Sequence, residues 1–209
     1  MSFDPFHPPE EIIEEASRVI RAGGVVLHPS DTVYGLACDP FNREALRRLL
    51  QIKGRPEGRG FLLIVHNLEV INDVSDTVNK VFYELTEELW PGPVTLLLKG
   101  RKELPPALLG ERGQLGVRFP ELPFLKLWVE NIPGPVVSTS ANLSGEVLPE
   151  SVSQLRSLFG ERVDLFLEGG EVDPGVKPST VIDLTVDPPC IVREGQRLEQ
   201  VKESLRRRG

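Results

Sequence analysis

Residues 163–193, VDLFLEGGEVDPGVKPSTVIDLTVDPPCIVR, decide the fold class of this chain. Three short strand-prone runs follow one another in this stretch, at residues 163–167, 180–184 and 191–193. The Gly- and Pro-rich segments between them lack the apolar spacing of a helix. Consecutive strands without crossover helices favour a mixed sheet over a doubly wound parallel one.

Outside this stretch, helices and strands alternate, but not in strict βαβ order. Short apolar runs predict buried strands at residues 25–27, 61–65, 94–98, 116–119 and 136–138. Apolar spacing and end signals predict helices at residues 9–22, 76–89, 123–129, 151–159 and 196–208, and one more that Asn42 caps. No internal repeat or linker interrupts this pattern. We therefore expect a single three-layer domain over residues 1–209, of the α/β class in its mixed α+β form, with no second C-terminal domain.

Composition excludes several classes of protein. The chain has 209 residues, 40% of them hydrophobic and 26% charged, as in an ordinary globular protein. It has neither an apolar run of about 18 residues nor a signal-like N-terminus, so we expect a cytoplasmic protein that does not enter a membrane. Two cysteines and three scattered histidines predict no disulfide framework and no metal site. The net charge of −7 argues against binding to nucleic acid by bulk electrostatics.

A basic cluster stands out in this acidic chain. Between Arg43 and Arg59 the sequence carries six basic and two acidic residues. Such a cluster is typical of an anion site, although a solvated helix face has the same composition. Lys53 and Arg55, which we expect at the surface, flank Gly54. If the segment is extended, the two cations point the same way and suit an oligophosphate; if it ends a helix, it forms the C-cap.

Two polar segments each follow a predicted strand. The first, PSDTVYGL at 29–36, presents hydroxyls and a carboxylate to a ligand, or forms a turn that satisfies its own backbone. The second, STSANLSG at 138–145, has five hydrogen-bonding side chains within seven residues. Small hydroxyls and an amide in such a loop bind phosphate, ribose or base edges.

Two arginines lie in or at the end of apolar strands. A buried arginine needs an anionic partner, and for Arg118 and Arg193 this is either a protein carboxylate, such as Asp183 or Glu121, or a ligand carboxylate or phosphate. Composition and spacing alone therefore indicate an α/β domain that binds small anions.

Taken together, eight motifs resemble those of the YrdC-type threonylcarbamoyl-AMP synthase family. In the family's order they are PSDTVYGL (29–36), IKGRP (52–56), LIVH (63–66), WPGPVTLLL (90–98), GVRFP (116–120), STSANLSG (138–145), PSTVIDL (178–184) and IVREG (191–195). Each motif alone is a weak signal, but eight in order are specific. With the flanking helices the resemblance covers essentially the whole chain, which is similar to the short, single-domain form.

The resemblance implies a twisted, mostly mixed and antiparallel sheet, flanked by helices, with a concave basic face. It also implies a nucleotidyltransferase that condenses L-threonine, bicarbonate and ATP to threonylcarbamoyl-AMP and pyrophosphate. That product feeds threonylcarbamoyladenosine formation in tRNA. The implied partners are a downstream tRNA-modification transferase complex and, more weakly, tRNA or double-stranded RNA. Mg²⁺ would arrive with ATP, and the protein would supply positioning and positive charge, without a covalent intermediate.

The resemblance also assigns roles to residues. The family's nucleotide-binding signature falls on Lys53, Arg55, Ser140 and Asn142, of which the two cations would be catalytic, and Arg193 would add a cation at the phosphates. The threonine-binding positions fall on Thr32, His66, Arg118 and Ser179, with Thr139 beside them. The sequence departs from the family's pattern at Ser30, Gly60-Phe61 and Leu148.

Three other functions stay open at this point. They are a YciO-like paralogue, an RNA-binding module of the same fold, and a free-standing relative of the carbamoyltransferase maturation domain. The intact nucleotide-binding signature favours the synthase over the paralogue. The acidic net charge disfavours the RNA module, and the third reading would need further domains.

Overall fold

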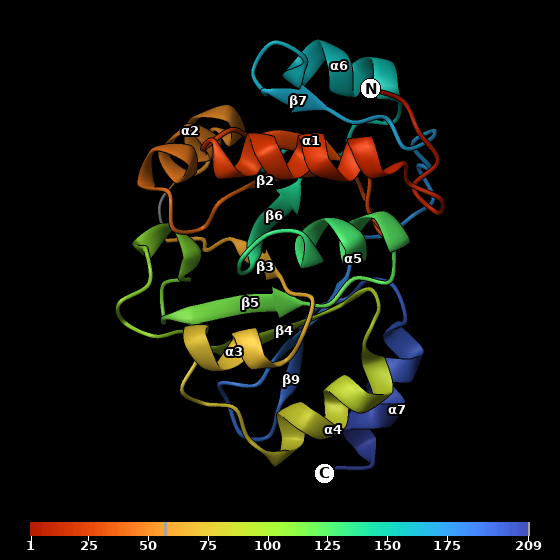
Figure 1. Cartoon of the computed structure of the whole chain (residues 1–209). Coiled ribbons are helices and arrows are strands. Elements are labelled where there is room, and N and C mark those ends of the chain that lie inside the picture. Colours follow the sequence, from red (N-terminus) through yellow and green to blue (C-terminus); the bar gives the residue numbers. More distant parts are fainter. Residues whose placement is uncertain (57, 209) are drawn as a thin grey trace.

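One mixed β-sheet forms the framework of the computed structural model, which describes residues 1–56 and 58–208 (Figure 1). In that part of the chain nine strands lie in the order β7-β1-β2-β6-β3-β5-β4-β8-β9. The strands are β1 (Val26–His28), β2 (Gly35–Cys38), β3 (Leu62–Ile64), β4 (Val94–Lys99), β5 (Gln114–Arg118), β6 (Val136–Ser140), β7 (Leu165–Phe166), β8 (Thr180–Asp183) and β9 (Cys190–Arg193). The helices are α1 (Glu10–Arg21), α2 (Arg43–Lys53), α3 (Glu69–Val74), α4 (Lys80–Leu89), α5 (Pro123–Glu130), α6 (Val152–Phe159) and α7 (Leu198–Arg206), with a 3₁₀ turn η1 (Pro106–Leu108).

Antiparallel and parallel pairs alternate irregularly across the sheet. The pairs β1–β2, β2–β6, β3–β6, β4–β5 and β8–β9 are antiparallel. The pairs β1–β7, β3–β5 and β4–β8 are parallel. The expected mixed sheet is therefore confirmed. Residues 163–193, which predicted the mixed sheet, supply both of its edge strands, with β7 at one edge and β9 at the other.

The two faces of the sheet bury two separate cores. Side chains alternate along each strand, so that Leu27 joins one core and its neighbour Val26 joins the other. The larger core packs one face against α2, α3, α4 and α7, through the buried side chains Leu49, Ile71, Phe82 and Val201. This face is covered along most of its length.

The opposite face is covered only in part. Helices α1 and α5 lie side by side against it (Figure 1), and their side chains Ile20 and Trp128 pack on Val26, Ala37 and Val136. Together with the helices of the other face they make the expected three layers. Over β3, β4, β5 and β8, the uncovered part of this face forms the floor of a cavity.

Most of the expected elements are present, with ends that differ by a few residues. Three short elements were not predicted: β2, α3 and the 3₁₀ turn η1. Strand β2 stands where the sequence indicated only a polar turn, because its pairing with β1 and β6 decides its conformation rather than its own propensity. Helix α3 has six residues, too few for a periodic signal. The helix predicted at 76–89 begins at Lys80, since the Asn79 side chain caps it by accepting from the Phe82 N–H at 3.0 Å.

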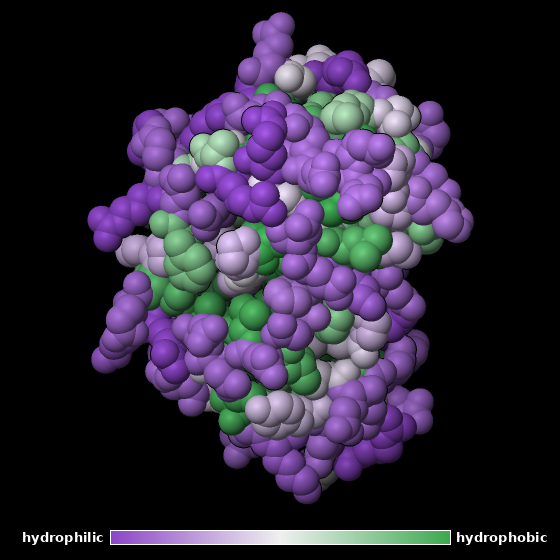
Figure 2. All heavy atoms as spheres, in the orientation of Figure 1, coloured by the Kyte–Doolittle hydropathy of each residue, from purple (hydrophilic) through white to green (hydrophobic). Residues whose placement is uncertain are grey.

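The face of the molecule drawn in Figure 2 is mostly hydrophilic. Figure 2 shows polar side chains over much of one face, with apolar side chains gathered between α3 and α5. None of the helices in residues 1–56 and 58–208 combines the length and the apolarity needed to cross a membrane.

Candidate functional site: a cavity lined by arginines

The uncovered part of the sheet is the floor of a cavity of about 510 Å³. One row of cross-strand neighbours runs through this floor: Ser138 of β6 lies beside Leu62 of β3, which lies beside Gly116 of β5, which lies beside Leu97 of β4. All four residues line the cavity. The sheet thus brings segments that are far apart in sequence to a single surface.

Four arginines line this cavity: Arg55, Arg59, Arg118 and Arg193. Among the described residues that line it there is no Asp or Glu. Hydroxyl and amide side chains complete the polar lining, from Ser30, Thr32, Thr95, Gln114, Ser138, Thr139, Ser140, Asn142 and Ser179. A concave site with several cations and no lining carboxylate favours an anion with more than one negative charge.

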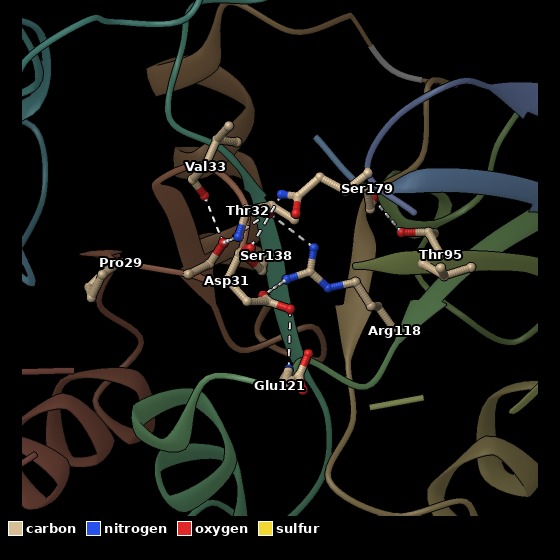
Figure 3. A network of polar contacts seen from close by, with 12 residues as sticks. Pro29, Asp31, Thr32, Val33, Thr95, Arg118, Glu121, Ser138 and Ser179 are labelled. Atoms are coloured by element: carbon tan, nitrogen blue, oxygen red, sulfur yellow. Dashed lines mark hydrogen bonds and ion pairs between the residues drawn. The ribbon is translucent and has the colours of Figure 1, made fainter. Parts of the chain in front are cut away.

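Figure 3 shows the guanidinium of Arg118 turned toward Asp31 and Thr32. Arg118 is the most buried of the four arginines, at 4% exposure. It ends β5, and its Nη2 is paired with the Asp31 carboxylate, while its Nη1 donates to Thr32 Oγ1 at 3.1 Å. Burial lowers the pKa of this guanidinium below its ordinary value, and Asp31 acts in the opposite direction. The Nε–H is buried and has no hydrogen-bond partner among the described residues.

One of the two alternatives for Arg118, a protein carboxylate, is confirmed, but the carboxylate is Asp31 and not Asp183 or Glu121. Arg193 is exposed rather than buried. Asp183 accepts from Arg112 Nη2 at 3.1 Å, and Glu121 accepts from Arg197 Nη2 at 2.5 Å. The reason is reach, since Asp31 approaches Arg118 from a loop next to β2, 87 positions away in the chain. For Arg193, the partner is Ser179: the guanidinium donates to its carbonyl at 2.9 Å and to its Oγ at 2.9 Å.

Lys53 is buried, not exposed as expected. Its side chain is 1% exposed, and its Nζ donates to the carbonyl of Ser140, to the carbonyl of Asn142 at 2.7 Å and to Asn142 Oδ1 at 3.2 Å. Burial, with repulsion from Arg55, lowers the pKa of the ammonium to about 8. The extended arrangement was also wrong, because α2 runs to Lys53 and Gly54 ends it at φ 57°, in the left-handed region.

Arg55 therefore points to a different place from Lys53. Its Nη2 donates to the Arg59 carbonyl at 2.8 Å and to the Gly60 carbonyl at 2.5 Å, and its guanidinium lies over the Phe61 ring at 5.1 Å. Arg55 lines the cavity, whereas Lys53 lies behind the lining. The two cations thus bind different carbonyl groups.

Ser140 and Asn142 form a small network at the end of β6. Ser140 Oγ donates to Asn142 Oδ1 at 2.6 Å, and Asn142 Nδ2 donates to the Glu146 carbonyl at 2.7 Å. With the three bonds from Lys53, the conformation of this loop is over-determined. Both side chains line the cavity, so a ligand meets a rigid polar edge.

His28 contacts the site from behind its lining and was not singled out by the sequence analysis, whereas its partner Ser138, from STSANLSG, lines the cavity. His28 is fully buried; its Nδ1 lies 2.9 Å from the Pro29 carbonyl and its Nε2 lies 3.1 Å from Ser138 Oγ. A neutral imidazole that donates from Nδ1 to the Pro29 carbonyl must accept at Nε2. The Ser138 hydroxyl therefore donates its proton to His28 Nε2. Gly35 of PSDTVYGL leaves room for this contact, since a Cβ there would lie 2.7 Å from His28 Nε2.

His28 makes stability sensitive to acid. Burial lowers its pKa to about 4, and repulsion from Arg118 acts in the same direction. Between about pH 6.5 and 4 the unfolded chain binds a proton at this position and the folded chain does not, so stability falls as the pH falls through that window, by up to about 3 kcal/mol. We expect urea unfolding at several pH values to show a shallower decline for His28→Gln. Parallel curves for the two proteins would contradict this assignment.

The remaining predicted site residues divide into two groups. Thr32, Thr139 and Ser179 line the cavity together with Arg118 and Arg193. His66 does not: it follows β3, its Nε2 lies 2.8 Å from Asn67 Nδ2, and its buried Nδ1 has no partner in the part of the chain that the structure describes. The fold thus brings together nearly all of the residues that the motifs indicated.

A family model decides the relationship that the motifs suggested. The Sua5/YciO/YrdC model, described as telomere recombination, matches residues 18–195. The chain belongs to the Sua5/YciO/YrdC family.

Two curated members of the Sua5/YciO/YrdC family are similar over most of their length. "Uncharacterized protein YciO" of Escherichia coli K12 is 37% identical over 193 residues, which are 91% of this chain and 92% of that protein. A threonylcarbamoyl-AMP synthase of Coxiella burnetii is 34% identical over 171 residues, which are 82% of this chain and 91% of that protein. The expected family is therefore confirmed.

A solved structure in the Sua5/YciO/YrdC family confirms the fold. P. abyssi Sua5 complexed with L-threonine superposes with a TM-score of 0.88 at 29% identity. The match covers 98% of this chain and 60% of the Sua5 chain, so the present chain spans less than two thirds of that protein.

Proposed function

We propose that this protein is a threonylcarbamoyl-AMP synthase, which condenses L-threonine, bicarbonate and MgATP to threonylcarbamoyl-AMP and pyrophosphate. The observation that carries the proposal is the cavity of about 510 Å³ with four arginines and, among its described lining residues, no carboxylate. The similarity to named synthases supports it. We also propose that the chain forms a single domain, because all of its described strands belong to one sheet.

The reaction needs two anions to meet. The amine of threonine forms a carbamate with bicarbonate and loses water, and an oxygen of that carbamate attacks the α-phosphorus of ATP. The bond from this phosphorus to the β-phosphate bridging oxygen breaks, and pyrophosphate leaves with the electron pair. Negative charge builds on the α-phosphate and the leaving group, so what the protein supplies is position and fixed positive charge.

The nucleotide is proposed to lie against Arg55, Arg193 and the rigid edge of Ser140 and Asn142. Arg55 and Arg193 then face the phosphates as cations that touch the reacting groups. Lys53 is a positioning residue in this proposal, because its ammonium is turned toward the Ser140 and Asn142 carbonyls. Magnesium enters bound to the phosphates, since the described lining of the cavity offers it no carboxylate ligand.

The threonine substrate is proposed to lie around Arg118, beside a second set of polar residues that line the cavity. The guanidinium of Arg118 donates to the threonine carboxylate, with Thr32, Thr139 and Ser179 as neighbouring hydroxyls. Asp31 holds the far side of the guanidinium and so keeps it in place. We leave His66 out of these contacts, because it does not line the cavity.

A second candidate is the role of YciO, to which the chain is 37% identical, against 34% for the synthase of C. burnetii. Amino-acid dependence separates the two candidates. We expect purified protein with MgATP and bicarbonate to release pyrophosphate only when L-threonine is added. The release is followed by a coupled phosphate assay, and labelled bicarbonate should appear in the adenylate.

Two variants make this test specific. Arg193→Ala removes a cation at the phosphates and is expected to slow pyrophosphate release about a hundredfold. Arg18→Ala, on the exposed side of α1, is expected to leave the rate unchanged. Release that is indifferent to the amino acid counts against the threonine assignment, and no release with any amino acid favours the YciO-like role.

A further inference from the structure

A second cavity, of about 600 Å³, adjoins the first and has a different character. Loops around β1, α5, α6 and β8 build it, and most of its lining is apolar. These apolar residues are Pro5, Phe6, Pro29, Val33, Tyr34, Leu122, Ala141, Leu148, Pro149, Leu155, Val172, Pro174 and Val176. Phe6 is 63% exposed, so one aromatic side chain stands at the edge without a cover.

The charge of this second cavity is opposite to that of the first. Five carboxylates line it, from Asp31, Glu121, Glu150, Glu171 and Asp173, and its described lining residues include no Lys, Arg or His. Asp31 and Glu121 are paired with arginines. Glu150, Glu171 and Asp173 form no ion pair with any residue that the structure describes. The rim therefore holds three carboxylates without a direct ion-pair partner in residues 1–56 and 58–208.

The two cavities are neighbours. Ser30, Thr32, Val33 and Leu148 line both of them. The Asp31–Arg118 ion pair also joins them, because Asp31 lines the acidic cavity and Arg118 lines the basic one. An occupant of the acidic cavity thus lies next to whatever the basic cavity holds.

We propose that the acidic cavity is a docking site for a protein segment that carries apolar side chains flanked by lysines or arginines. An apolar centre inside a polar rim, with an exposed aromatic, is the anatomy of a protein interface. The unpaired carboxylates complement basic side chains. They repel the phosphates of a nucleic acid, which therefore belongs elsewhere on the surface.

The charge distribution also decides against two simpler occupants. A small amine satisfies one or two carboxylates, whereas the unpaired ones come from two separate loops, before α6 and before β8. A second copy of this chain would have to offer a basic apolar segment. Its basic C-terminal residues Arg207 and Arg208 are already bound to Glu88 and Glu84 of the same chain.

Synthetic peptides test the site without the reaction, so a failure here is distinct from a failure of the proposed synthase activity. The probe is a capped hexapeptide with a Leu-Phe core flanked by lysines. Two matched peptides replace the lysines by glutamates or the core by serines. We expect saturable binding of the first peptide alone in calorimetry, weakening as salt is raised.

Variants locate the binding. Glu171→Gln with Asp173→Asn removes two rim charges and keeps the Asp173 Oδ1 acceptor for the Gly175 N–H. We expect it to weaken the peptide about fivefold. Phe6→Ser is expected to weaken it as well, through lost apolar contact. The matched control Glu130→Gln with Glu161→Gln removes two exposed carboxylates outside this cavity and should leave binding unchanged.

Four results of the peptide and variant experiments overturn the proposal, and a fifth comes from RNA. They are no saturable binding of the lysine peptide at millimolar concentration, equal binding of the serine-core peptide, equal weakening by the control variant, and self-association in sedimentation that the Glu171→Gln/Asp173→Asn variant abolishes. The last result would make a second copy the occupant. Binding of double-stranded RNA at Phe6 or Val172, seen by chemical-shift changes, would overturn it in favour of a nucleic acid.

Discussion

Lys53→Ala lowers the free energy of unfolding by about 2–4 kcal/mol and nearly abolishes activity. The change removes the Nζ donor from both carbonyls, so the Asn142 carbonyl loses this partner and the Ser140 carbonyl keeps only the Asn142 N–H, at 3.0 Å. It also empties the space of a side chain that is 1% exposed. The loop that carries Ser140 and Asn142 is then no longer held rigid at the edge of the cavity. Thermal unfolding and the pyrophosphate assay measure the two effects.

Two further variants separate the causes. Lys53→Met keeps the apolar stem and removes the charge, so we expect a smaller loss of stability with a similar loss of activity. Arg55→Ala, at a half-buried position, should lower activity with little change in melting temperature. An unchanged melting temperature for Lys53→Ala would mean that other contacts hold the loop, and Lys53 would lose its role as a positioning residue.

Arg118→Ala is expected to cost about 3 kcal/mol of stability, because it leaves the largely buried Asp31 carboxylate without its cation. It also removes the donor proposed for the threonine carboxylate. Binding of threonine should therefore fall much more than binding of ATP, as measured by calorimetry with each ligand separately. Equal losses for both ligands would remove Arg118 from the amino-acid site.

The double variant Arg118→Met/Asp31→Asn distinguishes a structural role from a binding role. It removes both charges of the pair, so most of the lost stability should return. Threonine binding should not return, since the guanidinium is still absent. Recovery of both would show that Arg118 acts only as the counter-ion of Asp31.

Much of the candidate site could be predicted from the sequence, because its residues belong to local motifs. Thr32, Arg118, Ser140 and Arg193 each stand at or near the end of an apolar run, where a side chain leaves the buried sheet. The contacts that these residues make could not be predicted. The partner of Arg118 was sought in Asp183 and Glu121, which are committed to Arg112 and Arg197.

The fold class, the family and the anion-binding character could be predicted from local features of the sequence. These features are the order of the apolar runs, the helix caps such as Asn42, and the eight motifs. Only the tertiary structure decided which way Lys53 points, that Gly35–Cys38 is a strand, and that a cavity of opposite charge adjoins the basic one. The physical reason is distance along the chain. The Lys53–Asn142 and Asp31–Arg118 contacts join residues 89 and 87 positions apart, and no local propensity specifies such a pairing.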